Sequence, residues 1–141
     1  MNVEGPASVA AFLETVRAWA AGEDDIEAVV LVGSHARGQA RPGSDVDLVI
    51  LTTDPQRYLR ERRWLETFGS VAAQNLEDWG RVTSVRAVYA DGLEVEFGLT
   101  TPDWAEAPVD EGTRQVIEKG CVVVFDRGGK LGHLTIRSGM T

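Results

Sequence analysis

Two aspartates at the start of an apolar segment are the residues of this sequence best suited to chemistry. Asp45 and Asp47 flank Val46 and are followed by the apolar run 48–51. Alternate side chains of a β-strand point to the same face, so both carboxylates would lie on one side of a sheet. Paired carboxylates repel each other unless a cation separates them, and Mg²⁺ prefers such oxygen ligands. The spacing therefore predicts that both aspartates bind metal.

A turn of small residues before these aspartates predicts a phosphate site beside the metal. Gly33 and Ser34 follow the apolar run 28–32, where a buried strand would turn into a helix. Glycine allows a close backbone approach, and a serine at a helix start offers its hydroxyl and free N–H groups to phosphate oxygens. Arg37 lies one turn further along and could contact a triphosphate or bridge to surface acids.

A later hairpin offers a third carboxylate. Asp91-Gly92 separates two strand-like runs, 82–89 and 93–99, and this dipeptide favours an antiparallel hairpin. Glu94 and Glu96 alternate along the second arm, so both would lie on one face of it. Periodicity alone does not choose between the two glutamates as a partner for the aspartates.

The remaining pattern predicts the elements that position these side chains. Apolar residues at helical spacing indicate a first helix that ends near Gly22, and Asp54-Pro55 opens a second helix that would continue to Phe68. A short helix is expected over 112–119 and a closing strand over 121–125. Strands that alternate with helices before a hairpin predict a mixed β-sheet flanked by helices, of α/β or α+β class. We expect one domain over residues 1–141.

The amino-acid composition limits the classes of binding partner and the cellular compartment that we expect for this protein. The chain has 22 acidic and 14 basic residues, which give a formal net charge of −8. This charge disfavours nucleic-acid backbones and anionic membrane surfaces, although a metal-bound nucleotide can still bind locally. No secretory leader or membrane-spanning apolar run is recognisable in the sequence, so we expect a cytoplasmic protein.

Several other reactive or aromatic residues are expected to be structural. Cys121 stands beside three valines, which favours a reduced thiol packed in a strand. His35 lies within the motif but has no second histidine nearby, so we expect no metal role for it. All four tryptophans are expected to pack in or on the core: Trp19, Trp64, Trp79 and Trp104.

The combined motif resembles a known superfamily. Gly33-Ser34, ten intervening residues and Asp45-Val46-Asp47 are similar to the signature of the DNA polymerase β superfamily of nucleotidyltransferases. The resemblance implies that Asp45 and Asp47 bind two Mg²⁺ ions and that a third carboxylate on a later strand completes the catalytic site. It also implies that residues of the first part of the motif and the residue before Asp45 hold the nucleotide, namely Gly33, Ser34, Arg37 and Ser44.

A more specific resemblance selects the third carboxylate. In adenylyltransferases of the streptomycin 6-adenylylating type, Asp-Gly is followed after three residues by the carboxylate, which corresponds here to Glu96. Those relatives usually carry Asp at this place. The resemblance implies that Glu96 helps to hold the ion that activates the acceptor hydroxyl for in-line attack on the α-phosphate.

The resemblance implies a nucleotidyltransferase, with ATP as donor and AMP as the transferred group. No counterpart of the C-terminal helical domain of the antibiotic-modifying enzymes is recognisable, whereas minimal nucleotidyltransferases consist of the catalytic domain alone. Some of these act as antitoxins that adenylylate a HEPN-type toxin, so the acceptor is either a small molecule or such a protein partner. The alternative is a nucleotide-binding or protein-interaction module without turnover.

Overall fold

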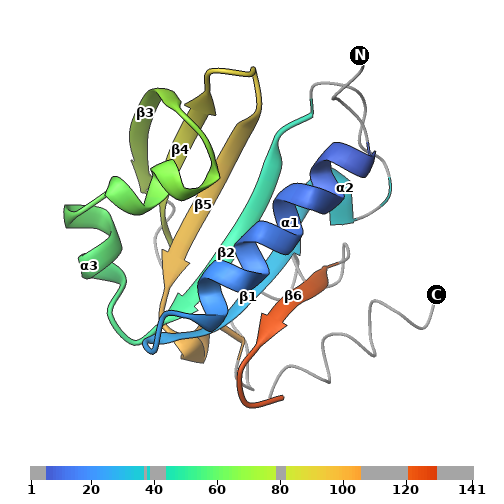
Figure 1. Ribbon diagram of the computed structural model, residues 1–141. Helices are drawn as coiled ribbons and strands as arrows, with labels where there is room; N and C mark the ends of the chain where they lie inside the picture. Colours follow the sequence, from blue (N-terminus) through green and yellow to red (C-terminus); the bar gives the residue numbers. More distant parts are fainter. Residues whose placement is uncertain (1–5, 37, 39–43, 79–81, 106–120, 130–141) are drawn as a thin grey trace.

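The computed structural model describes residues 6–36, 38, 44–78, 82–105 and 121–129. Its strands form one six-stranded sheet in the order β3-β4-β5-β2-β1-β6, with helices packed against it (Figure 1). The strands are β1 (Ile26–Val32), β2 (Val46–Thr52), β3 (Val71–Asp78), β4 (Thr83–Tyr89), β5 (Glu94–Thr100) and β6 (Val122–Asp126). The helical elements are α1 (Pro6–Ala21), α2 (Gly33–Ala36), α3 (Pro55–Arg60), and the 3-10 segments η1 (Arg63–Phe68) and η2 (Pro102–Ala105).

The sheet is mixed, as the sequence predicted. Strands β2 and β5 are parallel neighbours, and the other adjacent pairs are antiparallel. Both parallel strands begin at the upper end of the sheet in Figure 1. Their first residues are therefore brought side by side, although about fifty residues of the chain separate them.

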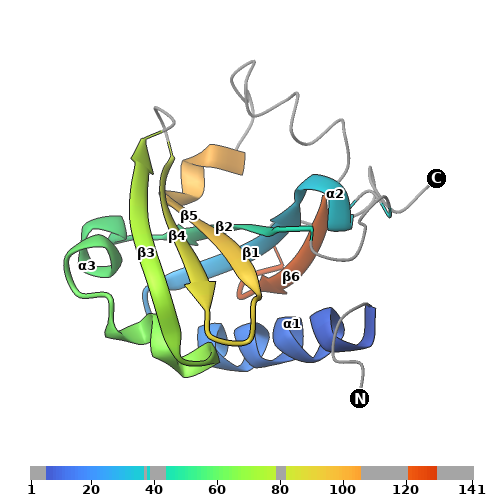
Figure 2. The same ribbon diagram turned by 90° about the horizontal axis from the view of Figure 1, so that it is seen from above.

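One face of the sheet carries the larger core. Helix α1 lies across this face, as Figure 2 shows from above, and it turns Phe12, Val16 and Ala20 inward at intervals of four residues. The strands contribute alternate residues such as Leu48 and Phe97. An aromatic group from α1, α3, η1 and β5 closes the core: Phe12, Trp19, Tyr58, Trp64, Phe68 and Phe97.

The opposite face carries a smaller apolar cluster at one end and charged residues at the other. The cluster consists of Ala28, Val30, Val49, Leu51, Trp104 and Cys121. Both α2 and η2 lie on this side of the sheet, opposite α1 (Figure 2). The burial of Trp104 and Cys121, at 3% and 0% exposure, confirms that these two residues are structural.

The prediction of one continuous helix from Pro55 to Phe68 was wrong. Asp54 caps α3 by accepting a hydrogen bond from the Arg57 backbone N–H, but α3 ends at Arg60 and η1 begins at Arg63. The indole of Trp64 donates to the carbonyl of Tyr58 at 2.9 Å. In an unbroken helix the side chains of these two residues would point about 120° apart around the axis. The break therefore brings both aromatic residues into the same core.

Other predicted elements have clear outcomes. The first helix, the strands over 28–32, 45–51 and 121–125, and the Asp91-Gly92 hairpin are confirmed within a few residues. The strand β3 was not anticipated. Trp19 and Trp64 stack on each other with ring centroids 5.3 Å apart, which confirms their packing role. The helix predicted over 112–119, as well as Trp79, lies outside the described residues.

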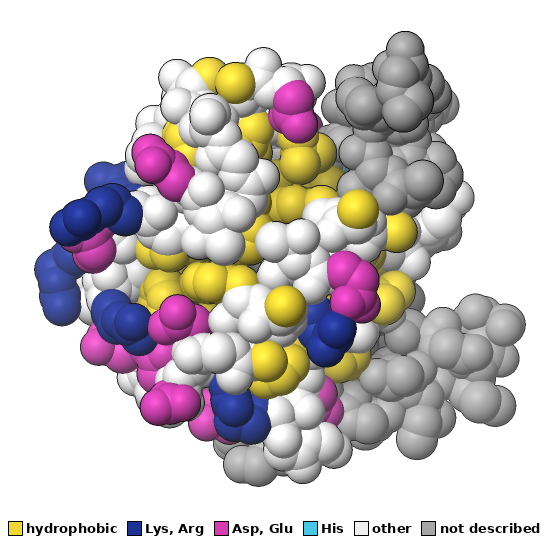
Figure 3. All heavy atoms as spheres, viewed as in Figure 1, with side chains coloured by type: hydrophobic (Ala, Val, Ile, Leu, Met, Phe, Trp, Pro, Cys, Tyr) yellow, Lys and Arg dark blue, Asp and Glu magenta, His cyan; other side chains and the backbone are white. Residues whose placement is uncertain are grey.

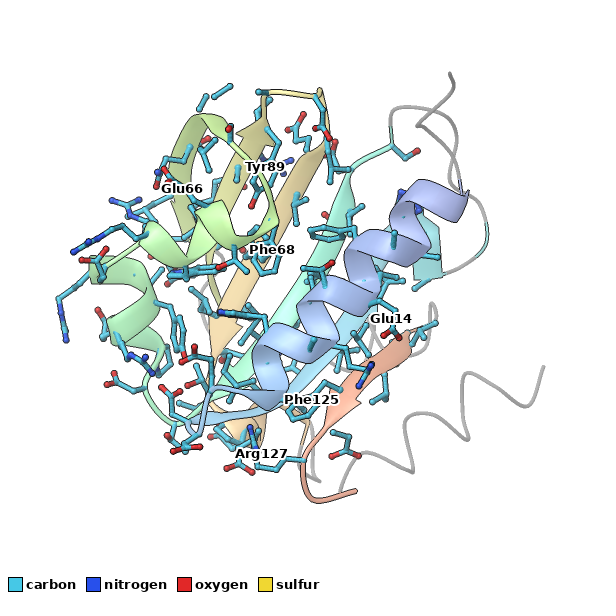
Figure 4. The ribbon with its side chains drawn as sticks, viewed as in Figure 1. Glu14, Glu66, Phe68, Tyr89, Phe125 and Arg127 are labelled. Atoms are coloured by element: carbon cyan, nitrogen blue, oxygen red, sulfur yellow. The ribbon has the colours of Figure 1, made fainter. Side chains whose placement is uncertain are left out.

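The residue that follows β6 also stabilises the C-terminal end of the first helix. Arg127, just after β6, lies beside the C-terminal end of α1 (Figure 4). Its guanidinium donates to the carbonyls of Ala20, Glu23 and Ile26 at 3.1, 2.8 and 3.0 Å. A cation at this helix end satisfies free carbonyls and complements the helix dipole.

Charged side chains on the α1 face gather mainly at its margin, toward α3 (Figure 3). There Arg57 pairs with Glu23 and Asp25. Burial pulls the pKa of Asp25 upward, but hydrogen bonds from Tyr58 and Arg57 outweigh it and lower that pKa. None of the helices in the described ranges is both long and apolar enough to cross a membrane.

Candidate active site

Three charged residues from three adjacent strands form one row across the sheet. Asp47 of β2 is the register partner of Glu96 on β5, and Glu96 is the register partner of Arg86 on β4. Register partners project to the same face, and this is the face opposite α1 because Leu48, Phe97 and the other alternate residues point into the main core. The sheet thus assembles the charged row from segments far apart in sequence.

Arg86 connects this row to three further carboxylates, those of Asp45, Glu77 and Glu94. Its Nη1 lies 2.7 Å from Asp45 Oδ2 and 2.9 Å from Glu94 Oε2. Its Nη2 lies 2.6 Å from Glu96 Oε1, and its Nε lies 3.3 Å from Glu77 Oε2 on β3. Burial alone would lower the pKa of Arg86, but the hydrogen bonds to Asp45, Glu77 and Glu94 raise it. The guanidinium is therefore held in its charged form.

Asp47 is partly buried and lies close to two other carboxylates. Its burial, together with the charges of Glu96 and Asp45, raises its pKa to about 6, although Arg86 and His35 act in the opposite direction. Its carboxylate packs against the backbone of Gly33, whose φ is +78°. A β-carbon at position 33 would collide with Asp47 Oδ2. Position 33 requires glycine both for this contact and for its backbone conformation.

The residues predicted to hold phosphate lie beside this aspartate. Ser34 is partly buried in α2, which directly follows β1 and is a single turn long. His35 Nε2 lies 3.3 Å from the carbonyl oxygen of Ser44, so the histidine links α2 to the segment that enters β2. No metal role was expected for His35, and this contact gives it a structural role. Arg37 lies outside the described residues.

The carboxylates meet the chemical requirements of a divalent-metal site. Asp45, Asp47 and Glu96 offer hard oxygen ligands on one face, and burial together with the charges of Glu96 and Asp45 raises the pKa of Asp47. A cationic group already occupies two of the three carboxylates, since Arg86 bonds Asp45 and Glu96. As the side chains stand, no three acidic, histidine or cysteine residues of the described ranges surround one point as a metal cluster.

Sequence reasoning missed Arg86 and Glu77. An arginine in the middle of the otherwise uncharged run 82–89 was a usable signal, because a buried or half-buried strand rarely places a charge there without a partner. Glu77 gave no such signal, since β3 has mostly exposed residues on both faces and shows no alternation. Glu94, the alternative third carboxylate, also bonds Arg86, whereas Glu96 alone is the register partner of Asp47.

The chain is similar to one domain family and to several solved structures. Residues 14–80 match the nucleotidyltransferase domain family. An aminoglycoside 6-adenyltransferase from Bacillus subtilis shares the fold with a TM-score of 0.55 and 20% identity, over 67% of this chain and 35% of that one. Cid1 in complex with a UTP analogue aligns with a TM-score of 0.48 and 23% identity, over 66% of this chain and 30% of that one.

The chain therefore spans about a third of the length of each of these two proteins, since the alignments cover 35% and 30% of their chains. A cytoplasmic RNA terminal U-transferase aligns similarly, with a TM-score of 0.49 and 23% identity over 66% of this chain and 28% of that one. No curated protein was found with significant sequence similarity.

Proposed function

We propose that this chain, which belongs to the DNA polymerase β-like nucleotidyltransferase superfamily, transfers a nucleoside monophosphate from a nucleoside triphosphate to a hydroxyl group. One observation carries the proposal. Asp47 and Glu96 are register partners on parallel strands, Asp45 precedes Asp47 by two residues on the same face, and Gly33 lies against Asp47. This arrangement supports the proposal because it brings three carboxylates close to the turn that we propose for phosphate binding.

In this proposal Asp45, Asp47 and Glu96 hold Mg²⁺, with two ions expected. Bound Mg²⁺ would supply the Lewis acidity that neutralises phosphate charge and lowers the pKa of an acceptor hydroxyl. The protein groups hold and orient the reactants. Ser34 and the backbone after Gly33 would donate hydrogen bonds to the triphosphate, and the carboxylates would align the acceptor oxygen with the α-phosphate.

ATP is the proposed donor and AMP the proposed transferred group. The acceptor is a hydroxyl of a small molecule or of a protein side chain, and a toxin-like protein is one such partner. A hydroxyl acceptor is consistent with carboxylates that can orient an O–H and receive its proton as the bond to phosphorus forms. Pyrophosphate would be the leaving group, and no covalent enzyme intermediate is required.

The test is Mg²⁺-dependent thermal stabilisation by a panel of nucleoside triphosphates, in wild type and in the double substitution Asp45→Asn and Asp47→Asn. Stabilisation by ATP that requires Mg²⁺ and is lost in the variant is the expected result. No stabilisation by any triphosphate would contradict the proposal. A matched control is Asp24→Asn with Asp54→Asn, which removes two acidic charges outside the site.

Transfer is then measured with radiolabelled ATP by following pyrophosphate release and labelled products with candidate hydroxyl acceptors. Product that disappears in the double variant supports catalysis. Tight Mg²⁺-dependent nucleotide binding without product from any acceptor would instead favour a binding module that uses nucleotide to set a conformation.

A further inference from the structure

Arg86 holds an unusual number of carboxylates for one guanidinium. Four carboxylates bond it, from the segment before β2 and from β3 and β5: Asp45, Glu77, Glu94 and Glu96. Its side chain is 22% exposed. Among the described residues, every salt bridge to these four carboxylates comes from Arg86. The electrostatic balance of the site therefore depends on this side chain.

The partners of Arg86 belong to two groups. Asp45 and Glu96 are candidate metal ligands in the proposed function, and they make the two shortest contacts, at 2.7 and 2.6 Å. Glu77 and Glu94 are not candidate ligands of first choice, and their contacts are longer, at 3.3 and 2.9 Å. The guanidinium therefore spans the border between the metal ligands and a second acidic pair.

We propose that Arg86 is an internal counter-ion of the metal site, which holds Asp45 and Glu96 in the metal-free protein and must release both before a divalent cation binds there. This inference rests on the proposed function. It makes Arg86 a positioning residue that competes with the metal.

Competition follows from the geometry of the contacts. The hydrogen bonds of Arg86 occupy Asp45 Oδ2 and Glu96 Oε1, one oxygen of each of two candidate metal ligands. A guanidinium and a metal ion in contact with the same carboxylates would also repel each other strongly.

The second acidic pair gives the released guanidinium a place to remain. Glu77 Oε1 is buried and has no hydrogen-bond partner among the described residues, while Glu77 Oε2 already accepts from Arg86 Nε. A buried carboxylate oxygen without a partner is costly. Arg86 can therefore move toward Glu77 and Glu94 and gain a new acceptor as it leaves the metal ligands. The exchange keeps the arginine paired in both states.

The test measures metal affinity rather than activity. Mn²⁺ binding without nucleotide is followed by electron paramagnetic resonance of the free ion in wild type, Arg86→Met and Arg86→Lys. Thermal unfolding of each protein is measured in EDTA. We expect Arg86→Met to melt earlier in EDTA and to bind Mn²⁺ about tenfold more tightly or better, because the competing cation is gone. Arg86→Lys should lie between the two, since lysine keeps the charge but lacks the planar fork.

Arg57→Met is the matched control. It also removes one positive charge and a guanidinium that pairs with two carboxylates, Glu23 and Asp25, but at the margin near α3. Its Mn²⁺ affinity should equal that of wild type. An equal gain in both methionine variants would reduce the effect to net charge and overturn the inference.

The outcomes separate this inference from the proposed function. If wild type binds Mn²⁺ and both Arg86 variants bind it equally or more weakly, Arg86 does not compete and only this inference fails. If wild type and both variants bind no Mn²⁺, the metal assignment in the proposed function fails as well. If Arg86→Met does not fold in EDTA, the Mn²⁺ affinity of Arg86→Lys alone tests the inference. Tighter Mn²⁺ binding than in wild type supports competition, and unchanged or weaker Mn²⁺ binding refutes it.

Discussion

The two faces of strands β2, β4 and β5 consist of alternate residues of the same three segments, but they are stabilised in opposite ways. On the α1 face Leu48, Val85 and Phe97 are buried among many apolar neighbours. On the other face one guanidinium balances several carboxylates. The first face has many small contributions that substitute for one another, whereas the charged end of the second face, beyond its apolar cluster, depends on a single positive charge. Stability is thus concentrated on one side and unbalanced charge on the other.

The largest expected effect comes from a substitution that removes packing on the α1 face. Phe97 is fully buried and its ring contacts those of Phe12, Trp64 and Phe68. Phe97→Ala should lower the free energy of unfolding by about 3–5 kcal/mol, measured by urea denaturation. Leu76→Ala on β3, where the side chain is 50% exposed, is the control and should change it little. A loss at position 97 as small as the control would show that the core is not on this face.

The next largest effect comes from a substitution that adds a β-carbon next to the charged residues. Gly33→Ala should cost about 2 kcal/mol, because alanine disfavours the positive φ and its β-carbon displaces Asp47. Combining it with Asp47→Ala separates the two causes. The cost of Gly33→Ala should shrink in that background, and an unchanged cost would mean that the contact with Asp47 is unimportant.

A smaller effect tests the unbalanced charge through pH. The pKa of Asp47 is raised to about 6, so the folded chain binds this proton more tightly than the unfolded chain does. The resulting stabilisation is complete below about pH 4 and disappears as the pH rises through the folded-state pKa. In EDTA, Asp47→Asn should therefore be more stable than wild type by about 1–2 kcal/mol near pH 7.5, and its advantage should shrink near pH 5.

Magnesium should reverse that order. Asparagine is a poor substitute for a carboxylate ligand, so Mg²⁺ with ATP should stabilise wild type near neutral pH and leave Asp47→Asn unchanged. Thermal unfolding at several pH values, with EDTA or with Mg²⁺ and ATP, measures both parts. Equal pH profiles in EDTA for the two proteins would contradict a raised pKa at Asp47.

The smallest effect concerns a polar group on the α1 face. Tyr89 is buried, and its hydroxyl donates to the carbonyl of Leu65 at 2.8 Å, which ties β4 to η1. Tyr89→Phe should lower the free energy of unfolding by about 1 kcal/mol and leave Mn²⁺ affinity unchanged. Faster hydrogen exchange confined to η1 would identify this bond as the cause. A change in metal affinity would show that the two faces are coupled.

Local patterns were sufficient for most of the elements. The helical spacing before Gly22 and the apolar run before Gly33 each correspond to an element of the fold. Asp45, Asp47 and Glu96 do lie on one face, because strand alternation and the hairpin are local properties. Whether they bind metal and nucleotide remains a prediction that the experiments above address.

The network of Arg86 was not predictable, because it depends on strand register. The hairpin loop has three residues, 90–92. Just before it, the Tyr89 N–H donates a hydrogen bond to the Leu93 carbonyl. A hairpin closed by Asp91 and Gly92 alone would shift the pairing by one residue and place Arg86 opposite Phe97 instead of Glu96. The sequence also gave no indication that β3 would bring Glu77 to the other side of Arg86.

The attachment of Arg127 to the end of α1 has a consequence for synthesis on the ribosome. Strand β1 lies between β2 and β6, so the nascent chain can form β1 and α1 early but cannot complete their surroundings until residue 127 has emerged. Until then one edge of β1 and the last carbonyls of α1 depend on water or on a chaperone for partners. Native closure should therefore come late in translation, in a single step that joins the earliest and latest described segments.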